Sequence, residues 1–127
     1  MSLFKLSMAL LALIASCAAS AQVVQKPAIA FEGSDAQHGA TFTQEIRKRL
    51  AVVFTVNPEG PRQWGAYLHV LDPNKTPMVY SVTYVDSCNG RWCWRNTVTG
   101  VCNVGTVKEC ADSVFNRTMD FVNQSPQ

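Results

Sequence analysis

The residues best suited to recognition chemistry gather in one short segment, Asp86–Asn96, which reads DSCNGRWCWRN. It holds two of the three tryptophans, two arginines and two cysteines around an Asn89-Gly90 pair. Asn-Gly between two strand-like runs predicts a two-residue hairpin turn, because both residues tolerate positive φ. Tryptophan and arginine are enriched among the residues that dominate protein–protein interfaces. The segment therefore nominates a binding surface made of Arg91, Trp92, Trp94 and Arg95.

Side-chain alternation along this hairpin separates the tryptophans from the cysteines. One face is predicted to carry Tyr80, Val82, Tyr84, Cys88, Arg91, Cys93 and Arg95. The other is predicted to carry Val79, Ser81, Thr83, Val85, Trp92, Trp94 and Val98. Two interpretations stay open at this point. The rings either stand exposed as a partner site or belong to the core, where large aromatics usually lie.

Four cysteines, Cys88, Cys93, Cys102 and Cys110, predict two disulfides, because an even number in a small exported domain is typical of such cross-links. Zinc is the competing interpretation, but the C-x4-C-x8-C-x7-C spacing lacks the close pairs of structural zinc sites. The expected geometry puts Cys88 and Cys93 on a diagonal, with Cβ atoms about 7 Å apart. We therefore expect a Cys88–Cys93 bond only if the tryptophans are buried, and exposed tryptophans if Cys88 or Cys93 bonds Cys110.

Catalytic patterns are weak in this chain. The cysteines left for pairing are even in number, no G-x-S-x-G turn or glycine-rich phosphate loop occurs, and His38 and His69 have no second ligand at metal spacing. The sequence therefore favours a protein that is not an enzyme and that uses neither a metal nor another cofactor.

The first residues resemble an export signal, with Lys5 before an apolar run from Leu6 to Ala15 and small residues after it. Ala19-Ser20-Ala21 predicts cleavage after residue 21, which would release a periplasmic or secreted protein. Ile14-Ala15-Ser16-Cys17 fits a bacterial lipobox instead, and lipidation of Cys17 would give a membrane-anchored lipoprotein. We favour the cut after residue 21, and expect one domain over residues 22–122 with a flexible tail at 123–127.

The chain has 11 basic and nine acidic residues, a net charge of +2. That balance argues against nucleic acid as a partner, which would need a basic stripe. The densest basic run, Arg47-Lys48-Arg49, is predicted to be the solvated face of a helix.

Hydrophobic patterning predicts a small α+β domain of order β-α-β-β-β-β-α, with a mostly antiparallel sheet and both helices on one face. Phe42, Ile46 and Leu50 recur at helical spacing within residues 36–52, and a second helix is expected at 104–122. Strands are expected at 28–31, 54–56, 66–71, 78–86 and 91–98.

Residues 28–85 contain "FTQEIRKRLA", "FTV", "AYLHVL" and "VYSVTYV" in that order. This succession resembles the amino-terminal domain of TolB and related accessory lipoprotein domains of the Gram-negative envelope. The resemblance implies a protein-binding accessory domain without catalytic residues. A periplasmic inhibitor or immunity protein against a toxin or a lysozyme-type hydrolase is the alternative, since Ivy-type lysozyme inhibitors are similar in having a short loop between two cysteines.

Overall fold

The structure is a computed structural model that describes residues 25–125. The elements are β1 (Ala28–Glu32), α2 (Gln37–Val53), β2 (Thr55–Val56), β3 (Trp64–Val70), β4 (Met78–Cys88), β5 (Arg91–Cys102), the 3₁₀ turn η1 (Val104–Thr106) and α3 (Val107–Gln124). The predicted α+β class is confirmed. The expected signal peptide and Cys17 lie outside the described residues.

The five strands form one sheet in the order β2-β1-β3-β4-β5. β1 runs parallel to both β2 and β3, whereas β3, β4 and β5 are antiparallel neighbours. The sheet is thus mixed, and most of its paired residues lie in the antiparallel β3–β4–β5 ladders, as predicted. The parallel pairs arise because α2 returns the chain to the side of the sheet where β1 begins, which is the connection that parallel strands require. The loop over residues 57–63 then crosses β1 to begin β3.

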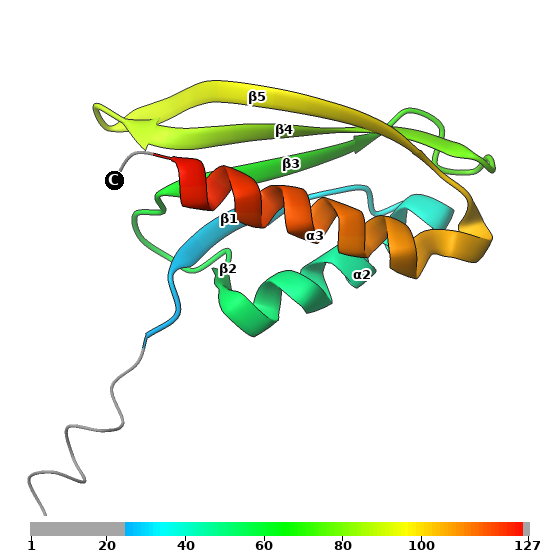
Figure 1. The fold of residues 1–127 in the computed structure, drawn as a ribbon, viewed down its shortest axis with the longest axis horizontal. Coiled ribbons are helices and arrows are strands. Elements are labelled where there is room, and N and C mark those ends of the chain that lie inside the picture. Colours follow the sequence, from blue (N-terminus) through cyan, green and yellow to red (C-terminus); the bar gives the residue numbers. More distant parts are fainter. Residues whose placement is uncertain (1–24, 126–127) are drawn as a thin grey trace, which may run out of the picture.

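Both helices cover the same face of the sheet, as predicted, and the other face carries neither of them (Figure 1). From α2, the expected stripe of Phe42, Ile46 and Leu50 is fully buried. From α3, Ala111 and Val114 pack into the same core. The sheet contributes alternate residues of its strands, among them Ile29, Phe31, Ala66, Leu68, Val82 and Tyr84. Strands whose side chains alternate between the two faces thus pack against two amphipathic helices, and together they form one core between two layers.

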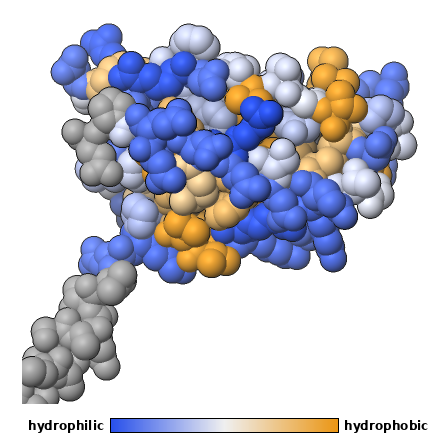
Figure 2. All heavy atoms as spheres, in the orientation of Figure 1, coloured by the Kyte–Doolittle hydropathy of each residue, from blue (hydrophilic) through white to orange (hydrophobic). Residues whose placement is uncertain are grey.

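Hydrophobic residues on the side seen in Figure 2 form small separate patches amid hydrophilic ones. One patch lies over the C-terminal end of α2, where Val52 is exposed. Scattered apolar residues of this kind are ordinary for a protein surface, so they nominate no partner site.

The β4–β5 pairing contains one extra residue. Val85 pairs with Trp94 but Tyr84 pairs with Asn96, which makes Arg95 the bulged residue. The bulge reverses the alternation beyond it, so that Val98 pairs with the buried Val82 and packs against the core. The prediction that Val98 shares a face with the tryptophans is therefore wrong.

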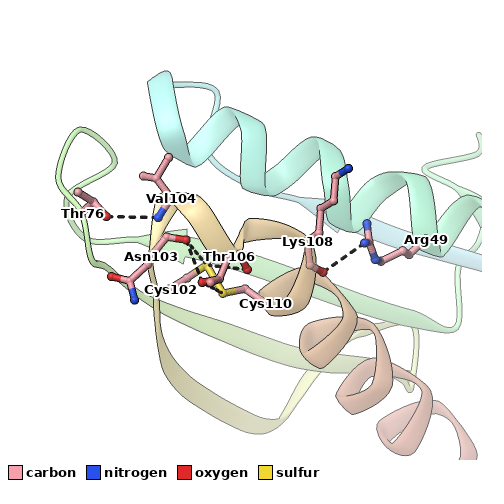
Figure 3. Close-up of a disulfide and its surroundings, with 8 residues drawn as sticks. All are labelled: Arg49, Thr76, Cys102, Asn103, Val104, Thr106, Lys108 and Cys110. Atoms are coloured by element: carbon pink, nitrogen blue, oxygen red, sulfur yellow. Dashed lines mark hydrogen bonds between the residues drawn. A yellow bond between two sulfur atoms is a disulfide. The ribbon is translucent and has the colours of Figure 1, made fainter.

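A disulfide between Cys102 and Cys110 joins the end of β5 to the first turns of α3 (Figure 3). Residues 104–106 form a 3₁₀ turn beside it, in which the Thr106 N–H donates to the Asn103 carbonyl at 3.0 Å. The last helix therefore begins at 107 rather than 104. It continues to residue 124, two residues beyond the expected end.

The prediction that Arg47-Lys48-Arg49 is the solvated face of a helix is wrong for Arg49, whose guanidinium binds partners on two helices. Its Nε donates to Asp112 Oδ1 at 2.6 Å and its Nη1 to Glu45 Oε2 at 2.8 Å. Its Nη2 reaches the carbonyl of Lys108 at 3.2 Å (Figure 3). The guanidinium thus links α2 to α3, because five fixed donors can serve several acceptors at once.

Candidate functional site

The β4–β5 hairpin turns at Asn89 and Gly90, with φ of 52° and 77°. Positive φ at both positions is what the Asn-Gly signal predicts. Cys88 pairs with Arg91, and the register continues without a break to Val85 and Trp94, as expected from the sequence. The hairpin therefore fixes the direction of each tryptophan through ordinary strand alternation.

Trp92 and Trp94 stand on the sheet face away from the helices, with 39% and 65% of their surface exposed. The Trp94 indole Nε1 donates to Thr97 Oγ1 at 3.0 Å, which holds the ring along β5. The third tryptophan, Trp64, is buried on the helix side, where it pairs with Asp86. Both rings are thus exposed and do not belong to the core.

The other side of the same hairpin carries a disulfide between Cys88 and Cys93, with Cα atoms 5.9 Å apart. The expectation that this bond requires buried tryptophans is wrong. The Cα separation lies within the range that disulfides span, so the diagonal positions are close enough. Cys110 is out of reach of both, because it lies at the opposite end of α3, about 21 Å from Gln124 at 1.5 Å per residue. The bonded pair lies past the C-terminal end of α3.

Arg95, the fourth nominated binding residue, has an internal partner. Its Nε lies 2.8 Å from Oδ1 of Asp86, a carboxylate that is only 2% exposed. Ser125 donates its Oγ–H to the second oxygen, Oδ2, at 2.9 Å. Arg95 therefore neutralises a buried charge. We define the tryptophan surface as Trp92 and Trp94 with Arg91 at its edge, where Arg91 lines a cleft together with Trp92.

A pocket of about 390 Å³ opens on the helix side of the bulge, between β5 and the C-terminal half of α3. Tyr84 stacks on Phe121 at its edge with ring centroids 4.9 Å apart. The Tyr84 hydroxyl lies 2.9 Å from Thr118 Oγ1, and burial raises the pKa of this phenol. Arg117 and Asp120 bring one charge of each sign to the rim. The pocket is thus electrically balanced and partly occupied by the structural Arg95–Asp86 pair.

A second, shallower cleft of about 450 Å³ lies between the loop over residues 57–63 and the tip of the hairpin. Arg62, Ser87, Arg91 and Trp92 line it, with Pro61 and two glycines. Sequence reasoning missed Arg62, because a single arginine in a proline-rich loop carries no pattern that assigns it to a surface 30 residues away. Trp92 belongs to both this cleft and the tryptophan surface.

Over residues 25–125, no three His, Cys, Asp or Glu side chains come close enough to hold a metal ion. His38 is half-buried at the start of α2, while His69 is exposed on β3. No helix in the described part of the chain is long and apolar enough to cross a membrane.

Comparison with known proteins gives no match among family models, curated proteins or solved structures.

Proposed function

We propose that this chain is an exported, non-catalytic accessory protein of the bacterial envelope that binds another protein through the tryptophan surface. The observation that carries the proposal is the exposure of Trp92 and Trp94 on the uncovered face of the sheet. Arg91 alternates to the other face of β5 but lines the adjoining cleft together with Trp92. Buried tryptophan and arginine contribute most to interface energy, whereas exposed rings cost hydration free energy in the unbound protein. β5 is also an edge strand, so its outer backbone groups can pair with a partner strand.

The envelope assignment combines three features of the sequence. The amino-terminal segment resembles an export signal, the four cysteines suit an oxidising compartment, and residues 28–85 resemble TolB-type accessory domains. Cleavage after residue 21 would release the domain to the periplasm or the medium. Acylation at Cys17 would instead hold the same binding surface near a membrane.

A second candidate, an inhibitor or immunity protein, is favoured by the shape of the hairpin. Its tip extends past the end of α3 (Figure 1) and is cross-linked by Cys88–Cys93. A projecting loop held rigid in this way loses little conformational entropy on binding, which suits insertion into an enzyme cleft.

A site-specific photo-crosslinker tests the proposal in the native cell. Placed at Trp94, it should yield a discrete protein adduct. Placed at Asn116, an exposed position on α3, it should yield none. No adduct from position 94, or the same adduct from both positions, would contradict the proposed surface.

The identity of the adduct separates the two candidates. An envelope component supports the accessory role. A toxin or hydrolase whose activity falls in a one-to-one complex supports inhibition instead, and in that case a crosslinker at Asn89 on the tip should capture it as well.

A further inference from the structure

The cleft between the loop over residues 57–63 and the hairpin tip has an unusual charge balance. Two of its lining side chains are the arginines Arg62 and Arg91, and no aspartate or glutamate of the described residues lines it. Glu59 precedes Gly60 on the same loop but is not part of the lining. The nearby Asp86 is buried and already paired with Arg95. The cleft therefore presents two positive charges that its own lining residues do not offset.

The two arginines of the cleft, unlike Arg49 and Arg95, have no carboxylate partner among the described residues. Arg49 and Arg95 each contact a carboxylate at hydrogen-bond distance. Within residues 25–125, neither Arg62 nor Arg91 forms an ion pair or a side-chain hydrogen bond. Arg62 is also half-buried. A guanidinium that has lost part of its hydration and has no acceptor is unfavourable until an anion supplies one.

The hydrophobic part of the cleft consists of Pro61 and the ring of Trp92, which is also part of the tryptophan surface. Gly60 and Gly90 have φ of 93° and 77°, and apart from their chain neighbours no described residue has an atom within 4 Å of where a Cβ would stand on either. The loop side and the hairpin side of the cleft therefore carry no side chain at these two glycines. A chain that lies across Trp92 can place a side chain between the two sides.

We propose that this cleft binds a carboxylate side chain from an acidic, extended segment of the partner protein. This inference rests on the proposed function, because it names the chemistry of the partner at the same surface. The guanidinium fork matches the two oxygens of a carboxylate, which makes arginine the side chain of choice for such contacts. The ring of Trp92 covers the aliphatic part of the same side chain. A partner segment is favoured over a free ion because Trp92 joins the cleft to the tryptophan surface.

A peptide titration of the exported protein, with both disulfides intact, tests the inference directly. The probe is a blocked Glu-Ser-Glu-Ser-Glu peptide, and its control has Gln in place of Glu. We expect the acidic peptide to shift the indole N–H signal of Trp92 saturably in a ¹⁵N–¹H spectrum, and the Gln peptide to leave it unchanged. Affinity should fall with added salt, because exposed charges are screened.

Matched variants locate the binding. R62Q/R91Q should lower the affinity for the acidic peptide by about tenfold or more, since each substitution removes a charge-assisted hydrogen bond. K108Q/R117Q removes the same charge from α3 and should leave the affinity unchanged. Equal shifts with both peptides, equal losses in both double variants, or displacement by inorganic phosphate or anionic phospholipid vesicles at the same anion concentration would overturn the inference.

Crosslinking at position 94 in the R62Q/R91Q background keeps the two proposals separable. An adduct that persists undiminished there leaves the proposed function standing and overturns the carboxylate inference. Absence of the adduct with intact arginines overturns the proposed function itself.

Discussion

The Nε atom of Arg95 lies 2.8 Å from Oδ1 of Asp86, a carboxylate held almost entirely out of water. The bulge in β5 supplies Arg95 as an additional residue at this point of the ladder. Ser125, at the end of α3, donates a hydrogen bond from its Oγ–H to the other carboxylate oxygen of Asp86. The pair thus links the end of the last helix to the base of the hairpin that carries the tryptophans. Bulges commonly redirect a side chain in this manner.

Replacing Arg95 with glutamine should lower the free energy of unfolding by about 2 kcal/mol. Removing one partner of a buried ion pair costs about 3–5 kcal/mol, and the loss is smaller here because the Arg95 side chain is 45% exposed to screening water. Urea denaturation measures the difference. Arg91→Gln removes the same charge without a partner and should change stability by less than about 0.5 kcal/mol. Equal losses in the two variants would show that the Asp86 contact contributes nothing.

The free energy of unfolding should fall as the pH rises through the alkaline range because of Tyr84. Burial raises the pKa of this phenol in the folded state. Above pH ~10 the unfolded chain releases the proton while the folded chain retains it, so ionisation favours unfolding and stability falls as pH rises.

The variant Tyr84→Phe tests this pH dependence. It should cost about 1 kcal/mol at neutral pH through the lost hydrogen bond to Thr118. Its stability should then fall less than that of the wild type between pH ~9 and ~11. Tyr67→Phe removes a phenol from the open face of the sheet and serves as the matched control. Parallel curves for Tyr84→Phe and wild type would contradict the prediction.

The two disulfides should contribute unequally. Their cysteines are five and eight residues apart, and loop entropy alone assigns about 2 to 2.5 kcal/mol to each. Cys102 is also buried in the core beside the start of α3, whereas Cys88 and Cys93 lie at the tip. We expect C102S/C110S to lower the melting temperature clearly more than C88S/C93S. The reverse order would mean that the hairpin tip, not the β5–α3 corner, limits unfolding.

Several elements are predictable from the sequence because each carries its own pattern. The spacing of Phe42, Ile46 and Leu50 requires a helix that buries one stripe, and Asn89-Gly90 sets the hairpin register as far as Val85 and Trp94. These features depend only on residues close together in the chain. Local patterns therefore suffice to predict the helix that packs on the core and the hairpin that carries the tryptophans.

The site itself depends on tertiary relationships that local patterns do not record. Alternation separates the tryptophans from the cysteines, but which face the helices cover is decided by how α3 packs. The bulge at Arg95 adds one residue to β5, and no glycine in the sequence indicates it. Alternation predicted from the sequence therefore places Val98 on the tryptophan face, although it lies on the helix-covered face with Val82. Arg62 reaches the cleft only because the loop over residues 57–63 folds beside the hairpin.

The affinity of the crosslinked partner for the variant W92A/W94A tests the tryptophan surface most directly. Because 39% of Trp92 and 65% of Trp94 is exposed, the variant should stay folded, with about 1–3 kcal/mol lost from the covered part of the rings. V79A/V101A is the matched control, because this exposed apolar pair faces the same way at the far end of β4 and β5. We expect W92A/W94A to weaken binding by about 30-fold or more and V79A/V101A to bind like the wild type. Wild-type affinity in a folded W92A/W94A protein would contradict the central claim.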